Sequence, residues 1–78
     1  MPRPQLNPEQ EAEVEEHLRR AAERLPDGVD LERFHALLDD GMLQFAWEEL
    51  RELAEARPTP FPFWLEMSKA GELLGHRS

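Results

Sequence analysis

The sequence has no cysteine and no tyrosine, and its only hydroxyl side chains are Thr59, Ser68 and Ser78. Without cysteine, neither a disulfide framework nor a thiolate metal site can form. None of the three hydroxyl groups has a base placed beside it by the sequence, which argues against nucleophilic catalysis. The four glycines are isolated, so no nucleotide-binding loop is present. We therefore expect a protein that is not an enzyme and has no cofactor.

Long hydrophobic runs are also absent. No segment approaches the roughly 18 consecutive apolar residues of a membrane span, and residues 1–6 lack the apolar stretch of a signal peptide. Together with the lack of cysteine, this predicts a cytoplasmic protein that does not interact with membranes. Isoleucine is missing and eight of the nine basic residues are arginine, a usage typical of a GC-rich bacterial genome.

The charge balance is strongly acidic. Seventeen acidic residues stand against nine basic ones, which gives a net charge of −8 over 78 residues. Such a charge favours a basic protein partner and opposes binding to nucleic acid or anionic lipid. The length supports one domain, residues 1–78, in which we expect residues 1–6 and 76–78 to be frayed.

The first half of the chain shows the start and stop signals of two helices. The segment Asn7–Gln10 combines an N-cap, a proline at the first helical position and the glutamine of a capping box, which predicts a helix that runs until Pro26. Asp30 is the expected N-cap of a short second helix, with Phe34 placed for a hydrophobic staple. Gly41 supplies the left-handed residue that ends it.

The second half predicts two more helices. Apolar residues keep to one side of a helix that runs to about Arg57, where Pro58 forbids continuation, and a last helix ends at Gly75. No alternating strand pattern appears, so the fold class is all-α: a small bundle of three long helices and one short helix. The expected core includes Val14, Leu18, Leu31, Phe34, Leu38, Leu43, Trp47, Leu50, Met67 and Leu74, and Leu37 is also placed on the buried side of the second helix.

Two pairs of residues have the spacing of metal ligands on one helix face. Glu13 and His17 are four residues apart, as are His35 and Asp39. Two ligands are too few for a site, and no third ligand clusters with either pair. We interpret both as surface histidines beside acids and expect no metal.

The third helix contains the candidate binding site. Acidic rows on the first helix are typical of a solvated face, on which the Glu15–Arg19 and Glu16–Arg20 ion pairs reduce the repulsion between carboxylates. On the third helix, by contrast, carboxylates surround the aromatic ring of Phe45, as in the hot spot of an interaction surface. An equally weighted alternative is that this ring is buried under a neighbouring helix. The predicted partner-binding residues are Met42, Phe45, Glu48, Glu49 and Glu52.

A second group of aromatic residues lies close to two prolines in the sequence and consists of Phe61, Phe63 and Trp64. It is compatible with a partner groove or with the cap of a small core, and the core is the favoured interpretation. Because these rings exceed what so small a core readily covers, a homodimer is a further hypothesis.

The run from Leu37 to Leu50, LLDDGMLQFAWEEL, followed by a proline-containing connector and a final helix ending in Leu73-Leu74-Gly75, resembles the MafI-type bacterial immunity proteins. Those proteins look like small acidic helical proteins with a leucine-rich helix, a Gly-Glu turn and then an alanine and a leucine four residues apart. Met42 stands where the family prefers glutamate after the glycine. The resemblance covers about half of the chain.

The resemblance implies that the chain binds and blocks the toxic domain of a bacterial toxin. Many such toxins are nucleases with basic sites, to which an acidic surface is complementary. Two alternatives remain open at this stage: a small helical adaptor or regulatory subunit that docks on a larger protein, and an acidic mimic of nucleic acid.

Overall fold

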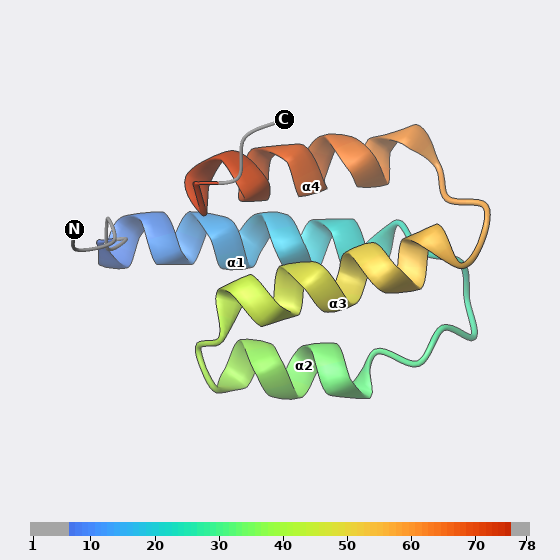
Figure 1. Ribbon diagram of the computed structural model, residues 1–78, viewed down its shortest axis with the longest axis horizontal. Coiled ribbons are helices and arrows are strands. Elements are labelled where there is room, and N and C mark those ends of the chain that lie inside the picture. The colour runs from blue at the N-terminus through green and yellow to red at the C-terminus, as the bar shows by residue number, and fades with distance from the viewer. Residues whose placement is uncertain (1–6, 76–78) are drawn as a thin grey trace.

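The computed structural model describes residues 7–75, and within this range every regular element is a helix. There are four helices, α1 (Pro8–Glu23), α2 (Glu32–Asp39), α3 (Leu43–Glu55) and α4 (Phe61–Leu73). Consecutive helices run in opposite directions, with α1 beside both α3 and α4 and with α2 packed against α3 (Figure 1). The predicted all-α class is therefore confirmed for these residues, whereas the termini expected to fray lie outside them.

The start of α1 agrees with its sequence signal. The Gln10 backbone N–H donates to Asn7 Oδ1 at 2.8 Å, and the Asn7 backbone N–H donates to Gln10 Oε1 at 3.1 Å. These two bonds form the predicted capping box, which satisfies amide groups that have no partner inside the helix. The helix ends with Arg24 as its C-cap, just before Pro26.

The predicted start of α2 was wrong by one residue. Leu31, not Asp30, is the N-cap, and it makes no side-chain capping bond. Asp30 still serves the first turn, because its Oδ1 accepts a hydrogen bond from the Glu32 backbone N–H at 3.0 Å. Gly41 has φ +74° and ends the turn after α2 as expected, since this left-handed conformation is strained for other residues.

The last two helices end slightly earlier than the sequence indicated. The C-cap of α3 is Ala56, not Arg57, whose Nε–H donates instead to the Leu53 carbonyl at 2.7 Å. Helix α4 begins after Pro60, carries a second proline in its first turn, where no amide partner is lost, and has Leu74 as its C-cap.

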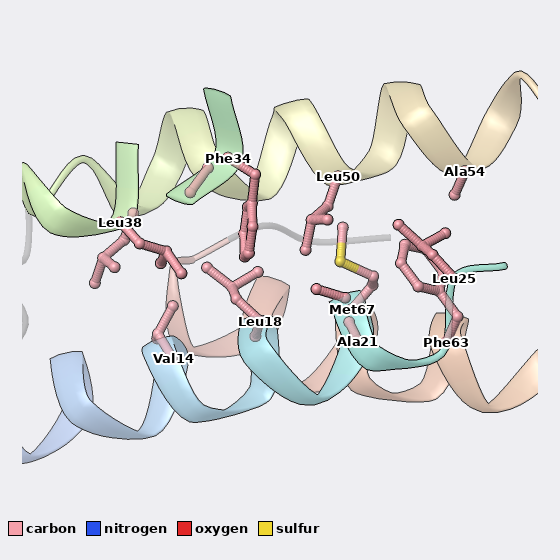
Figure 2. Close-up of a cluster of buried hydrophobic side chains, with 14 residues drawn as sticks. Val14, Leu18, Ala21, Leu25, Phe34, Leu38, Leu50, Ala54, Phe63 and Met67 are labelled. Carbon is pink, nitrogen blue, oxygen red and sulfur yellow. The ribbon is translucent and has the colours of Figure 1, made fainter. Parts of the chain in front are cut away.

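The core lies where all four helices meet (Figure 2). Seven of the ten predicted core residues are buried: Val14, Leu18, Phe34, Leu38, Leu43, Leu50 and Met67. The prediction was only partly right for Leu31, Trp47 and Leu74, which are half-buried and pack against the core from its edge, as does Leu37.

The core also contains residues outside that set of ten. Phe63 is fully buried, and Leu25 closes one end of the cluster (Figure 2). The remainder are alanines, whose small side chains allow neighbouring helices to approach closely. These are Ala21, Ala22, Ala46, Ala54 and Ala70.

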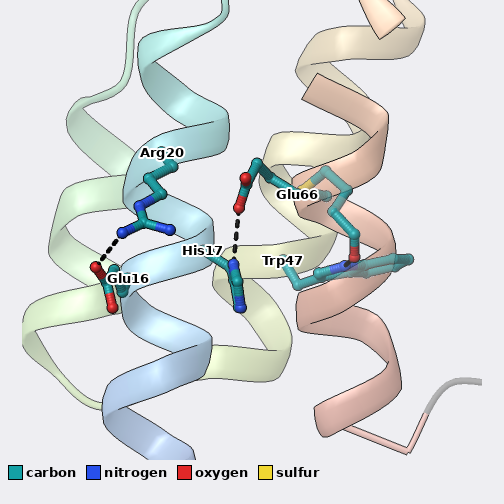
Figure 3. Close-up of polar contacts among 6 residues, drawn as sticks. Glu16, His17, Arg20, Trp47 and Glu66 are labelled. Carbon is teal, nitrogen blue, oxygen red and sulfur yellow. Dashed lines mark hydrogen bonds and ion pairs between the residues drawn. The ribbon is translucent and has the colours of Figure 1, made fainter. Parts of the chain in front are cut away.

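Trp47 illustrates why an expected core residue stays half-buried. Its indole Nε1–H donates to the Met67 carbonyl at 2.9 Å, which ties α3 to α4 (Figure 3). A buried indole N–H needs such a partner, and this bond places the ring at the edge of the core. Arg51 covers the ring from outside, with Cζ 5.4 Å from the ring centroid.

Candidate protein-binding site

Phe45 is exposed on α3. The buried residues of this helix are Leu43, Ala46, Leu50 and Ala54, which share the side that faces the core. Phe45 lies on another side, and 57% of its surface is accessible. Of the two alternatives considered from the sequence, burial under a neighbouring helix is therefore excluded. Met42, directly before the helix, is the N-cap and is exposed as well.

A shallow groove of about 150 Å³ runs between α2 and α3 beside this ring. Helix α2 supplies one basic and one apolar side chain, while α3 supplies the aromatic ring and three carboxylates. The lining residues are Arg33, Leu37, Phe45, Glu48, Glu49 and Glu52. Four of the five predicted partner-binding residues thus lie together, whereas Met42 is not part of the groove wall.

The electrostatics of the groove are unbalanced. Three carboxylates face one guanidinium, and the contact that joins them is long, with Arg33 Nε 3.8 Å from Glu49 Oε1. The Glu49 side chain is only 18% exposed, while the Arg33 side chain is 81% exposed. Within residues 7–75, no basic group comes within ion-pair distance of Glu48 or Glu52.

The sequence analysis missed Arg33 and placed Leu37 in the core. Leu37 is half-buried and forms the apolar side of the groove opposite Phe45. Arg33 stands one position before the buried Phe34 in the sequence, and this position was the signal that could have placed it near the core-facing side of α2. Its proximity to Glu49 depends on how α2 and α3 pair, which helical periodicity alone does not specify.

The aromatic group at the start of α4 is divided by the structure. Phe63 is 0% exposed and packs edge-to-face with the half-buried Trp64, with ring centroids 4.9 Å apart. Phe61 is 71% exposed, and Leu65 one turn further along is also exposed. The favoured core interpretation is therefore right for Phe63 and wrong for Phe61.

His17 pairs with a residue that the sequence did not suggest. Its Nδ1–H donates to Glu66 Oε2 at 2.7 Å and connects α1 to α4, while Glu13 of its own helix is exposed (Figure 3). This hydrogen bond lowers the pKa of Glu66, and electrostatic interactions with His17, Lys69 and Arg20 act in the same direction against the opposing effect of burial. His35 lies beside the ring of Phe34.

Other polar features on α1 agree with a solvated face. The predicted pairs form, with Arg19 bound to Glu15 at 2.6 Å and Arg20 bound to Glu16 at 2.5 Å. A second depression of about 210 Å³ lies between α1 and α2, and Arg19 is on its rim. In the part of the chain from 7 to 75, no three acidic or histidine side chains gather closely enough to hold a metal ion.

None of the helices described is long and apolar enough to cross a membrane. Comparison with known proteins yields no further assignment, because no family model, curated protein or solved structure matches the chain.

Proposed function

We propose that this chain is a cytoplasmic, non-catalytic binding domain, a bundle of three longer helices and one shorter helix, that acts as an immunity protein by binding and blocking a bacterial toxin domain. The observation that supports this most directly is an exposed aromatic ring, Phe45, beside the carboxylates of a groove. The resemblance of residues 37–50 to the MafI-type immunity proteins supports the choice of a toxin as the partner.

Phe45 has the properties of an anchor for a protein partner. A phenylalanine left half-exposed gains free energy when a partner covers it, and such residues dominate the binding energy of many interfaces. Leu37 adds apolar surface in the same groove, and Met42 is exposed three residues before Phe45. The surrounding carboxylates keep this area soluble in the free protein and limit which partners can cover it.

The charge favours a basic partner. Glu48, Glu49 and Glu52 lie on the same face, and the whole chain has a net charge of −8. Complementary fields raise the rate of association and exclude acidic competitors. A nuclease toxin fits because its active site is basic in order to hold phosphate groups, so an acidic domain that covers it also blocks the substrate.

The proposal can be tested by affinity capture from the native source at low salt. The bait is the full chain as wild type, with Phe45→Glu, or with Glu48→Lys and Glu52→Lys combined. We expect wild type to recover one basic toxin domain that both variants lose. Purified toxin activity should then fall in proportion to added wild-type protein, with a 1:1 end point.

Matched controls use the same substitutions elsewhere. Phe61→Glu alters another exposed phenylalanine, and Glu9→Lys with Glu13→Lys alters two exposed carboxylates on α1. Both controls should still capture the toxin. Recovery of a metabolic enzyme instead would favour the adaptor alternative, and competition with DNA for a host DNA-binding protein would favour the mimic; either result refutes toxin inhibition.

A further inference from the structure

The groove between α2 and α3 has the chemistry of a guanidinium site. Leu37 and Phe45 provide apolar walls, and three carboxylates lie along the same depression. Arg33 of the chain itself lines this groove, and its guanidinium is the basic group among the lining residues, with Nε 3.8 Å from Glu49 Oε1. Three carboxylates and one guanidinium leave the groove wall with two uncompensated negative charges.

We propose that this groove is a subsite for an arginine side chain of the partner, and that Arg33 is an internal occupant which the partner's arginine displaces. The inference rests on the proposed function, because it takes this face as the surface that a basic protein covers. It adds the chemical identity of the group that is recognised and a residue of this chain that competes with it.

The wall chemistry favours arginine over lysine. The planar guanidinium donates two parallel hydrogen bonds to a carboxylate and stacks on an aromatic ring, while the ammonium of lysine is a compact and strongly hydrated charge. Phe45 offers the ring, and Glu48 and Glu52 offer the acceptors. The chain itself contains a contact of this kind on α3, where Arg51 lies over the ring of Trp47.

The contact between Arg33 and Glu49 is weak enough for an arginine of the partner to displace Arg33. Its distance to Glu49 is 3.8 Å, beyond hydrogen-bond length, and the side chain is mostly in solvent. An exposed pair of this kind contributes little stability. An incoming arginine would gain two carboxylates that Arg33 does not reach, together with the ring of Phe45.

The test uses arginine and lysine with blocked amino and carboxyl groups, titrated into the full chain and followed by the NMR shifts of residues 33–52. We expect blocked arginine to bind with a Kd in the millimolar range, roughly, and to shift the groove residues. Blocked lysine should bind more weakly. Arg33→Ala should tighten arginine binding about two- to fivefold, the range expected when an exposed ion pair stops competing.

Two controls separate the groove from general charge. Arg24→Ala removes an exposed arginine and changes the net charge by the same amount as Arg33→Ala. Because Arg24 does not line the groove, this variant should leave arginine binding unchanged. Glu52→Gln should weaken binding, because it removes one of the two acceptors that Arg33 does not reach, while Glu13→Gln on α1 should not. The subsite would be overturned if Arg33→Ala and Arg24→Ala had equal effects, or if lysine bound as well as arginine. It would also be overturned if the NMR shifts were spread over α1.

This titration fails independently of the proposed function. If blocked arginine binds in the groove but the capture experiment recovers no toxin, the subsite stands and toxin inhibition is refuted. If a toxin is captured through Phe45 but blocked arginine does not bind in the groove, the arginine subsite is refuted and the proposed function remains.

Discussion

Two apolar patches are exposed in the described part of the chain, residues 7–75, and they differ in what surrounds them. The α3 patch consists of Met42 and Phe45, and the α4 patch consists of Phe61 and Leu65. Carboxylates border the α3 patch along the groove. Helix α4 instead carries Glu66, Lys69 and Glu72 as its only charged residues, and Glu66 is paired with His17.

The two patches therefore differ in the charge around them rather than in exposure, and this difference is the basis for proposing the α3 patch as the binding surface. Both patches contain a phenylalanine with more than half of its surface accessible. Only the α3 patch combines that ring with a strong field of one sign, which selects partners by charge and accelerates their approach. We therefore expect mutations of the two patches to separate binding, stability and self-association.

The largest expected effect distinguishes exposed from buried rings within α4. Phe63→Ala should lower the free energy of unfolding by about 3–5 kcal/mol, because it removes a fully buried ring and leaves a cavity. This is a large share of the stability of so small a domain. Phe61→Ala should change it by less than about 0.5 kcal/mol. Urea denaturation followed by circular dichroism measures both, and equal losses would contradict the division of this aromatic group.

The next effect compares the two patches in binding. Phe45→Ala should weaken binding of the partner by about 2 kcal/mol, roughly 30-fold in Kd, as expected for a central aromatic anchor. Its unfolding free energy should stay near that of wild type, because the ring is exposed. Phe61→Ala should bind like wild type. Isothermal calorimetry with the captured partner measures the Kd of each variant. A similar loss of affinity for Phe45→Ala and Phe61→Ala would show that Phe45 is not the anchor.

The attachment of α4 to α1 should depend on pH through Glu66. Its pKa is lower in the folded chain than the ordinary value of 4.5, so its stabilising effect is fully present above that value. The effect is lost as the pH falls through the lowered folded pKa. Glu66→Gln should therefore reduce the free energy of unfolding by about 1 kcal/mol at neutral pH and show a smaller acid-induced loss.

Glu72→Gln is the matched control for this pH dependence, since Glu72 is exposed on the same helix. It should retain both the neutral-pH stability and the acid-induced loss of wild type in urea denaturation at several pH values. An acid response of Glu66→Gln identical to that of wild type would show that the bond from His17 does not contribute.

A smaller effect concerns the rate of association. Glu48→Gln combined with Glu52→Gln should lower the association rate constant several-fold at low salt, and the difference should fade as added salt screens the field. Stopped-flow mixing with the partner measures this rate. The α1 variant Glu9→Gln with Glu13→Gln should have a weaker effect if the α3 patch faces the partner during approach; the reverse order would assign the steering field to α1.

The smallest effect is self-association through the α4 patch, the remaining form of the homodimer hypothesis. Two side chains provide much less than the roughly 800 Å² per partner of a stable interface, and the net charge of −8 opposes association. We expect sedimentation equilibrium to detect dimers only near millimolar concentration and high salt, and Phe61→Glu to abolish them. A tight dimer insensitive to Phe61→Glu would require a different interface.

Local sequence signals predicted much of this fold. The capping box at Asn7, the glycine turn at Gly41 and the stop before Pro58 depend on neighbouring residues, so the sequence contains the information directly. The expected burial of Val14 and Leu18 on α1 was also confirmed, because these residues repeat at helical spacing.

Features that depend on how helices pair could not be predicted in this way. Phe61 and Phe63 are two residues apart and chemically identical, and only the docking of α4 decides which one is buried. The bond from His17 to Glu66 and the contact of Arg33 with Glu49 have the same origin. Charge around Phe45 indicated the candidate site, whereas its α2 wall required the tertiary structure.

The pairing of the first and last helices has a consequence during synthesis. The apolar stripe of α1 is complete when Glu23 has been added, but α4, which covers one side of it, is complete only at Leu73. At ordinary translation rates these 50 residues take roughly 3–10 s. During that interval α4 cannot cover the stripe, and we expect charge repulsion among the glutamates of α1 to oppose aggregation of the nascent chain.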